Sequence, residues 1–360
     1  MTQSRLPLTE IAGIVGETNV LTKPEDCYCY GYDASKLHAM PECVAFPGNE
    51  MEIAALLQLA NRHRFPVFPR GAGSGMVGAA IPEGGGLVMV LRRLNRILAI
   101  DEDNMLAVVQ PGVVTGDFQK AVRTLGLYYP PDPASLPFST LGGNVAMCAG
   151  GPKAVKYGVT RDYVLGLRVV LPTGEPLRTG TRTVKGVVGY DLTRLLVGSE
   201  GTLGVLTEIV LRLIPAPESE RTMLAVFDRI EGAAQAVSEI IRQRIVPSTL
   251  ELMDQATVRV VEDYLRIGLP VESEALLLIE VDGPACALDQ QMERIVSICR
   301  RCGASETKIA DSEAERDQLW LARRSISPAL RQLKPGKINE DVTVPRTRIP
   351  QLIRAVQALA

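Results

Sequence analysis

The stretch FPVFPRGAGSGMVGAA, residues 65–80, carries glycine at positions 71, 73, 75 and 78. Counted from Gly73, this spacing satisfies G-x-G-x-x-G, which forms the phosphate turn of a Rossmann domain when it opens a helix. Here the chain continues as MVGAAIPEGGGLVMVL, in which Pro82 and three consecutive glycines exclude a helix of useful length. The Rossmann match is therefore accidental, and the loop must serve another purpose.

Three glycine-lined segments share this character. In the first loop, backbone amides can converge on an anion because no Cβ stands in the way, and Arg70 can add a charge-assisted contact. A turn without a ligand is the alternative for that loop taken alone. The second segment, PPDPASLPFSTLGGNVAMCAGGPKAVKYG (130–158), predicts little regular structure and lacks the polarity of a solvent loop. The third, GSEGTLGVLTEIVLRL (198–213), runs straight into a strand. Together, the three segments predict one extended ligand lying along them.

Composition sets the general class of the protein. A chain of 360 residues suggests about two domains, and 39 basic against 41 acidic residues give no argument for nucleic acid binding. Neither a signal peptide nor an apolar run of about 18 residues is present, so we expect a cytoplasmic protein without a transmembrane segment.

Seven scattered cysteines do not form a disulfide framework. We interpret Cys299 and Cys302 as thiols on the last turn of a helix capped by Gly303. With two histidines, His38 and His63, we expect no metal site.

The periodicity divides the chain into three parts. Residues 1–40 read as a helical segment followed by a loop. A strand in ECVAFPGN, a helix over 50–64 with Asn49 as N-cap, and a strand in FPVFP then predict a βαβ unit. Further strands and a helix over 115–126 lead to PAPESE (215–220), a proline-bearing hinge that is the best domain boundary. Beyond it, alternating strands and helices predict an α+β domain with a mostly antiparallel sheet. The last helix, RIPQLIRAVQALA, has no terminator, so we expect the chain to be cut inside this domain.

At this point a family resemblance emerges. The motifs VFPRGAGSG, PPDPAS…STLGGNVAMCAGG…KYG and GSEGTLGVLTEIVLRL resemble the FAD-binding domain of the vanillyl-alcohol-oxidase, or p-cresol-methylhydroxylase (PCMH), superfamily. The chain is most similar to the FAD-linked D-2-hydroxyacid dehydrogenases, which include glycolate oxidase catalytic subunits and D-lactate dehydrogenases. The resemblance implies an α+β protein. It would contain an N-terminal helical segment (1–40), a PCMH-type FAD-binding domain of two subdomains (41–217) and a cap domain with an antiparallel sheet (218–360), incomplete at its C-terminus.

The resemblance also implies where FAD binds. The first loop would wrap the pyrophosphate, the second would run beside the flavin and ribityl chain, and the third would close over the adenine side. The expected cofactor residues are Pro69, Arg70, Gly71, Ala72, Gly73, Ser74, Gly75, Gly78, Pro131, Asp132, Thr140, Leu141, Gly142, Gly143, Asn144, Ala149, Gly150, Gly151, Tyr157, Gly158, Glu200, Gly201, Gly204 and Ile209. Some relatives attach FAD through a histidine in the first loop. Neither histidine of this chain lies there, so we expect non-covalent FAD.

The implied substrate is a small 2-hydroxy acid, whose hydride passes to the flavin. In the family, an arginine at the position of Arg323 holds the substrate carboxylate. A guanidinium can bind a carboxylate through two parallel hydrogen bonds. Ser327, one turn beyond Arg323, stands at the position of a small hydroxyl residue of the family. Lys337 is a weaker candidate for substrate binding. The alternative is that the segment around Arg323 is a charged helix face exposed to solvent that binds no substrate. The family's base and metal come from a histidine segment, H-x-G-D-G-N-x-H, which is not in this sequence. We therefore expect FAD binding without complete catalysis and assign no catalytic base.

Two other functions stay open. The chain could be a flavin-carrying electron-transfer subunit without its own substrate site, or another enzyme of this fold, such as an alkyl-dihydroxyacetone-phosphate synthase or a cell-wall enolpyruvyl reductase. The segment PSTLELMD (247–254) fits the hydroxyacid branch better. A glycolate oxidase complex would add iron–sulfur and second flavin-type subunits as partners, and these could hold the chain at the inner membrane. The sequence does not name the acid or the electron acceptor.

Overall fold

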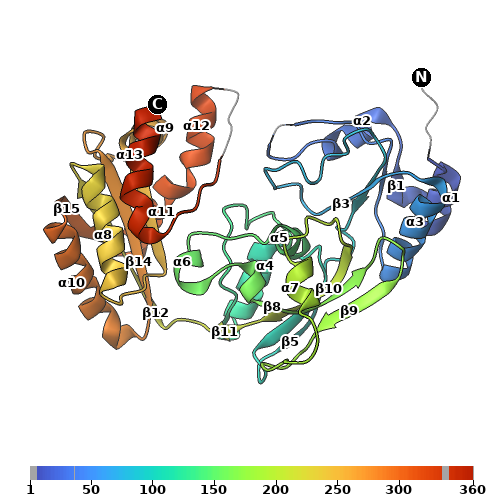
Figure 1. The fold of residues 1–360 in the computed structure, drawn as a ribbon, viewed down its shortest axis with the longest axis horizontal. Coiled ribbons are helices and arrows are strands. Elements are labelled where there is room, and N and C mark those ends of the chain that lie inside the picture. The colour runs from blue at the N-terminus through green and yellow to red at the C-terminus, as the bar shows by residue number, and fades with distance from the viewer. Residues whose placement is uncertain (1–5, 36, 335–339, 360) are drawn as a thin grey trace. The chain divides into compact units, whose positions relative to one another are not determined.

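The computed structural model describes residues 6–35, 37–334 and 340–359. The chain forms two compact units: Met1–Gly151 with Gly158–Ala216, and Pro152–Tyr157 with Pro217–Ala360. Figure 1 shows the order of the elements by colour along the chain. The second unit thus includes a short segment, 152–157, that we had placed in the FAD-binding domain.

The first unit begins with a mixed four-stranded sheet. Its strands are β1 (Val20–Leu21), β2 (Cys43–Ala45), β4 (Leu87–Val90) and β3 (Val67–Arg70), in that spatial order. Strands β2 and β3 both run parallel to β4, with helix α3 (Glu50–His63) between them in sequence, which is the predicted βαβ arrangement. Asn49 caps α3 as predicted, because its side chain accepts a hydrogen bond from the Glu52 amide at 2.9 Å. Leu56 and Leu59 of α3 pack in one fully buried cluster with Met89 of β4.

A five-stranded antiparallel sheet forms the rest of the first unit. Its spatial order is β5 (Ile97–Asp101), β6 (Leu106–Val109), β10 (Val205–Arg212), β8 (Val164–Val170) and β9 (Pro176–Gly180). The shorter elements of this unit are α1 (Leu8–Val15), η1 (Glu17–Asn19), α2 (Pro24–Cys27), η2 (Tyr28–Tyr30), α4 (Thr115–Arg123), β7 (Leu127–Tyr128), α5 (Leu141–Met147), η3 (Thr160–Asp162), α7 (Leu192–Leu196) and β11 (Ile214–Pro215).

Helix α5 corrects the prediction that residues 130–158 have little regular structure. Its sequence, LGGNVAM, is poor in helix formers, because glycine loses more backbone entropy than alanine. Hydrogen bonds to residues outside the helix compensate for this low helix propensity. The Gly142 amide donates to the Pro111 carbonyl at 2.8 Å, and the Asn144 side chain donates to the Thr115 hydroxyl at 2.6 Å. The Thr140 side chain caps the first turn. The surrounding fold therefore stabilises a helix that the local sequence does not favour.

The second unit is an antiparallel sheet with helices on both faces, which confirms the predicted α+β class. The sheet order is β13 (Thr249–Asp254), β14 (Ala275–Gly283), β12 (Ser219–Phe227) and β15 (Ala304–Ile309). Alternate residues of β12 serve the two faces: Met223 packs in the cluster of α8 (Ile230–Arg242) and α10 (Ala285–Arg301), whereas Leu224 packs in the cluster of α9 (Gln255–Leu265). Figure 1 shows α8 and α10 lying along the sheet. The remaining elements are α6 (Ala154–Tyr157), α11 (Glu313–Arg324), α12 (Ile326–Leu333), η4 (Arg346–Arg348) and α13 (Ile349–Leu359).

Ion pairs hold the segment 152–157 in the second unit. The Lys153 ammonium lies 3.3 Å from a carboxylate oxygen of Glu280, and Lys156 pairs with Asp282. The Tyr157 hydroxyl donates to the other oxygen of Asp282 at 2.9 Å. Glu280 and Asp282 are both buried on β14, so these cations compensate carboxylates that would otherwise be costly to remove from water.

The cysteine pair lies at the C-terminal end of helix α10. Helix α10 ends at Arg301, with Cys302 at the C-cap and Gly303 in the left-handed region at φ 92°, as we interpreted it.

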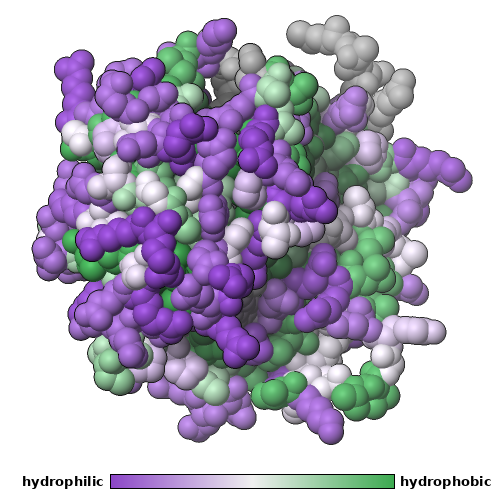
Figure 2. Space-filling view, turned by 60° about the vertical axis from the view of Figure 1, so that its left-hand side comes forward, coloured by the Kyte–Doolittle hydropathy of each residue, from purple (hydrophilic) through white to green (hydrophobic). Residues whose placement is uncertain are grey.

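The face of the molecule drawn in Figure 2 shows mostly hydrophilic residues. In the described part of the chain, no helix combines the length and apolar character needed to span a bilayer.

Candidate functional site

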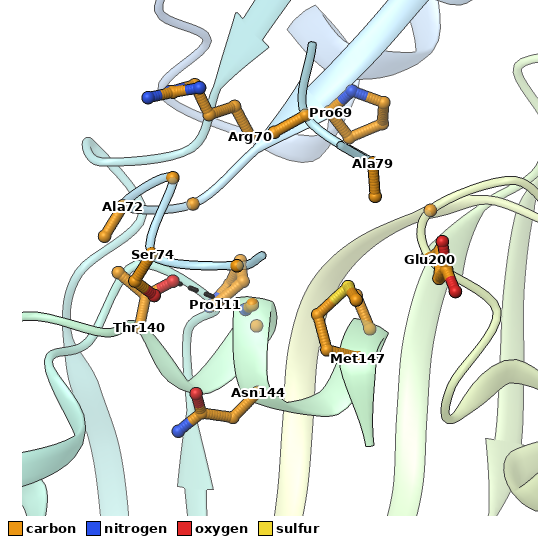
Figure 3. Close-up of a pocket in the computed structure, with 18 of the residues that line it drawn as sticks. Pro69, Arg70, Ala72, Ser74, Ala79, Pro111, Thr140, Asn144, Met147 and Glu200 are labelled. Atoms are coloured by element: carbon orange, nitrogen blue, oxygen red, sulfur yellow. Dashed lines mark hydrogen bonds between the residues drawn. The ribbon is translucent and has the colours of Figure 1, made fainter. Parts of the chain in front are cut away.

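The three glycine-lined segments meet in one pocket of the first unit, with a volume of about 230 Å³. Residues from the end of β3, from α5 and from the turn before β10 line it together (Figure 3). The predicted residues in the lining are Pro69, Arg70, Gly71, Ala72, Gly73, Ser74, Gly75, Thr140, Gly142, Gly143, Asn144, Ala149, Glu200, Gly201 and Gly204. Segments far apart in sequence therefore form one concave surface, as the sequence predicts.

The first loop is a backbone cradle rather than a helix start. After Arg70 the chain makes turns and bends through residue 86, with no helix. Gly73 lies at φ 68° and Gly78 at φ 81°, in the region that favours glycine. A Cβ on Gly73 would overlap the Arg70 guanidinium, and one on Gly71 would overlap the Thr140 hydroxyl. At Gly73 the positive φ is the stronger reason for glycine, because the flexible Arg70 side chain can move away from a Cβ, whereas at Gly71 the short Thr140 side chain would have to shift.

Arg70 is a buried cation at the edge of this cradle. The residue is 6% exposed, and its Nη1 has no hydrogen-bond partner within the described residues. Figure 3 shows its side chain beside the loop that carries Ala72 and Ser74. Burial lowers the pKa of Arg70 below its ordinary value, while the carboxylate of Asp33 acts in the opposite direction. A buried cation with an unused donor favours an anionic ligand at this place.

Helix α5 forms the opposite wall. Thr140 caps it, accepting a hydrogen bond from the Gly143 amide at 3.3 Å. The third loop is tied to this helix, because the Glu200 amide donates to the Ala146 carbonyl at 2.9 Å. Glu200 itself adopts a left-handed conformation at φ 56° and leads into Gly201 at φ 78°. Asn144 is nearly buried and is held by Thr115, so it supports the wall rather than offering a polar group to the pocket.

The structure does not bring every candidate to the pocket lining. The candidates outside it are Gly78, Pro131, Asp132, Leu141, Gly150, Gly151, Tyr157, Gly158 and Ile209. Leu141 and Ile209 have no exposed surface, because the first packs inward from α5 and the second pairs on both sides within the five-stranded sheet. Tyr157 belongs to the second unit, where its hydroxyl is engaged by Asp282. Gly78 lies between Val77 and Ala79, which do line the pocket.

Sequence reasoning missed several lining residues: Asp33, Val77, Ala79, Ala80, Leu91, Pro111, Ser135, Ala146, Met147, Val205 and Leu206. Ala146 and Met147 follow Gly143 at the i+3 and i+4 positions of α5, so a correct helix assignment would have found them. Figure 3 shows Met147 and Pro111 among the labelled lining residues. Asp33 has no motif around it, and only the fold brings it there.

The substrate candidates lie on two helices of the second unit, not on one. Arg323 belongs to α11, which ends at Arg324, and the exposed Ser327 belongs to α12, which begins at Ile326. Ser327 therefore follows Arg323 across a break at Ser325 and not within one continuous helix. Arg323 is not a solvated side chain, because its Nε donates to Glu251 Oε2 at 2.5 Å. Lys337 lies outside the described residues.

Comparison with known proteins identifies the family. Residues 41–180 match the family model of the FAD binding domain, and residues 216–360 match that of the C-terminal domain of FAD linked oxidases. The chain is 49% identical over 332 residues to the glycolate oxidase subunit GlcD of Bacillus subtilis, covering 92% of this chain and 71% of that relative. The chain belongs to the FAD-linked oxidase family. This FAD-linked oxidase is also 36% identical over 332 residues to a D-lactate dehydrogenase of Anaerostipes hadrus, covering 89% and 69% of the two chains.

Solved structures show the same fold for this FAD-linked oxidase. An alkyldihydroxyacetonephosphate synthase matches with a TM-score of 0.73 at 23% identity, covering 91% of this chain and 63% of that one. A p-cresol methylhydroxylase matches with a TM-score of 0.70 at 15% identity, covering 88% and 68%. These likenesses confirm the PCMH-type fold and, at such identities, nothing more. FAD is the cofactor of the family to which the chain belongs, and the predicted cofactor is confirmed.

The residues of the pocket fit FAD. The cofactor carries an anionic pyrophosphate, which suits the glycine cradle and the unpartnered donor of the buried Arg70. Its flavin and adenine rings suit an apolar lining such as Ala79, Ala146 and Met147. The chemistry of the lining and the family of the chain thus point to the same ligand.

Proposed function

We propose that this chain serves the oxidation of a small 2-hydroxy acid to the 2-oxo acid and holds FAD non-covalently in the pocket of the first unit. The printed names of its relatives, a glycolate oxidase subunit and a D-lactate dehydrogenase, support this substrate class. The single observation that carries the proposal is that all three glycine-lined segments line one pocket beside a buried, unpartnered arginine nitrogen. Bound FAD supplies the hydride acceptor.

The chain's own residues have distinct roles in this proposal. The amides of 71–75 and the guanidinium of Arg70 hold the pyrophosphate. The face of α5 that carries Gly143 and Met147, together with the turn at Gly201, forms the walls beside the rings. No histidine, cysteine or tyrosine is among the described residues that line the pocket, which supports non-covalent binding. His63 lies instead 3.3 Å from Glu10.

Arg323 holds the substrate carboxylate in this proposal. Among the described residues, Glu251 accepts a hydrogen bond from the Nε of Arg323 at 2.5 Å, and a substrate carboxylate can use the terminal nitrogens of the same guanidinium. About two thirds of the Arg323 side chain is covered, since 32% of it is exposed, so an ion pair there is partly protected from water. Ser327 stays a candidate for a hydroxyl contact from the neighbouring helix α12.

A second candidate, an electron-transfer subunit that works within a complex, also has an observation in its favour. The segment before α7 exposes four large apolar side chains: Val184, Val187, Val188 and Tyr190, with exposed fractions of 96%, 77%, 97% and 95%. Apolar groups this exposed are typical of surfaces that partners cover. The expected partners are iron–sulfur and second flavin-type subunits, and a cytoplasmic location at the inner membrane through them belongs to the same proposal.

Anaerobic flavin reduction separates the two candidates. The protein is loaded with FAD, freed of excess cofactor and mixed with glycolate, D-lactate or L-lactate without oxygen, while flavin absorbance is followed. Reduction by one of these acids, even at a slow rate, supports the oxidase, because we assign no catalytic base within this chain. Retention of FAD without reduction by any acid, together with oxidation of chemically reduced FAD by a partner subunit, supports the electron-transfer role.

A further inference from the structure

Asp33 and Glu200 are the two acidic residues among the described residues that line the pocket, which we assign to an anionic cofactor. Asp33 lies in the loop after η2 and precedes residue 41, where the match to the FAD binding domain begins. It is 5% exposed and lines the pocket. A buried carboxylate near a pyrophosphate is unfavourable unless its own hydrogen bonds and a nearby cation compensate it. The contacts of Asp33 explain its presence.

Two hydrogen bonds join this segment to the glycine loop. Asp33 Oδ2 accepts from the Gly78 amide at 3.0 Å, and the Ala34 amide donates to the Gly75 carbonyl at 2.9 Å. The other carboxylate oxygen, Oδ1, accepts from the Ser35 amide at 2.8 Å and the Ser35 hydroxyl at 2.5 Å. The hydrogen bonds from Ser35 therefore orient the Asp33 carboxylate, and this carboxylate holds the glycine loop at Gly78.

The loop needs such an anchor. Between β3 and β4 no regular structure holds residues 71–86, and glycines are the most flexible residues of a chain. Strand β3 sets the start of the glycine stretch 71–78, and Asp33 and Ala34 hold its other end at Gly75–Gly78. The Asp33 carboxylate is also the leading charged neighbour of Arg70, and it opposes the lowering of the Arg70 pKa by burial.

We propose that Asp33 is a positioning residue of the FAD site: it holds the Gly75–Gly78 end of the loop so that the amides of 71–75 face the pyrophosphate. The proposal rests on the assignment of this pocket to FAD. Its carboxylate acts through the loop and through Arg70 and does not itself bind the cofactor, because both oxygens already accept hydrogen bonds.

Removing this anchor should weaken FAD binding. A hydrogen bond to a charged group is worth about one to two orders of magnitude in an equilibrium constant. We therefore expect Asp33→Ala to raise the Kd of FAD about 10- to 100-fold. Asp33→Asn keeps one acceptor oxygen and should fall between Asp33→Ala and the wild type.

Titration of the apoprotein with FAD, followed by quenching of flavin fluorescence, gives the Kd. Phosphorus NMR of bound FAD reports the loop directly, and both Asp33 variants should shift the pyrophosphate resonances. Asp101→Ala is the matched control. Asp101 lies in the same unit and accepts from the amide and side chain of Asn104, both at 2.9 Å, but it does not line the pocket. This control should keep the wild-type Kd and resonances.

The outcomes are distinct. An unchanged Kd in Asp33→Ala, or an equal rise in Asp101→Ala, overturns the inference. If Asp33→Ala does not fold, Asp33→Asn decides by the same two readouts. The Gly73→Val variant distinguishes a failure of the proposed role of Asp33 from a failure of the assignment of the pocket to FAD. If Gly73→Val loses FAD while the Asp33 variants keep it, the pocket stands and the role of Asp33 does not. If Gly73→Val binds FAD normally, the pocket assignment and this inference both fail.

Discussion

Arg323 and Glu251 form an ion pair that joins helix α11 to strand β13, with 2.5 Å between Nε and Oε2. The carboxylate occupies one nitrogen of the guanidinium and orients the planar group. In the proposed function, the remaining nitrogens of this oriented guanidinium bind the carboxylate of the 2-hydroxy acid.

Arg323→Lys should raise the dissociation constant of the 2-hydroxy acid about 10- to 100-fold. A lysine is a point charge and cannot form the two parallel hydrogen bonds that a guanidinium gives a carboxylate. Calorimetric titration of the FAD-loaded protein with the acid measures the effect without requiring turnover. Arg324→Lys is the control on the adjacent position, where the guanidinium lies 5.5 Å from the Trp320 ring centre. Equal dissociation constants for both variants and the wild type would show that Arg323 does not hold the substrate.

Lys153→Met should destabilise the second unit by about 3 to 5 kcal/mol, because it leaves the buried Glu280 carboxylate without its cation. Trp320 is the only tryptophan of the chain, and its Nε1 donates to Glu280 at 2.9 Å. Its fluorescence therefore reports unfolding of this unit in urea.

The exposed ion pair of Lys308 and Glu315 in the same unit supplies the control for that experiment, and Lys308→Met should change stability by less than about 1 kcal/mol. A double variant, Lys153→Met with Glu280→Gln, should recover part of the loss. A Lys153→Met midpoint equal to the wild type would mean that Lys153 does not compensate Glu280.

Iodoacetamide labelling at pH 8 should modify the exposed Cys29 and Cys286 first and leave Cys299 unmodified in the folded protein. Burial raises the pKa of Cys299 to about 12, so only about one thiol in ten thousand is ionised at this pH. The same shift makes the contribution of Cys299 to stability constant below about pH 9 and smaller as the pH rises above it, since only the unfolded thiol ionises there. Mass spectrometry after short labelling measures the order. Rapid modification of Cys299 would contradict our structural interpretation of the C-x-x-C pair.

Sequence patterns predicted the elements whose signals are local. The Asn49 cap, the strands on both sides of α3 and the rejection of a helix after Gly78 depend on residues within a few positions of each other. The meeting of three glycine-lined segments also followed, because each segment opens onto a strand. These signals were sufficient for the fold class and for most of the pocket lining.

Features that depend on tertiary contacts were not predictable in this way. Helix α5 forms on a glycine-rich sequence because Pro111 and Thr115 accept its hydrogen bonds. Asp33 reaches the pocket only through the fold. The break between Arg323 and Ser327, by contrast, had a local signal: Pro328 has no amide hydrogen for the Arg324 carbonyl, so the helix is interrupted there.

The central claim is that the glycine loop after β3 holds FAD, and FAD binding by Gly73→Val tests it most directly. A valine side chain would overlap Arg70 and would strain a residue at φ 68°. Gly126→Val is the matched control, since Gly126 lies at φ 71° with no neighbour within 4 Å of an added Cβ. We predict that Gly73→Val folds, by circular dichroism, but retains no flavin after gel filtration, whereas Gly126→Val retains it. Wild-type flavin content in Gly73→Val would contradict the claim.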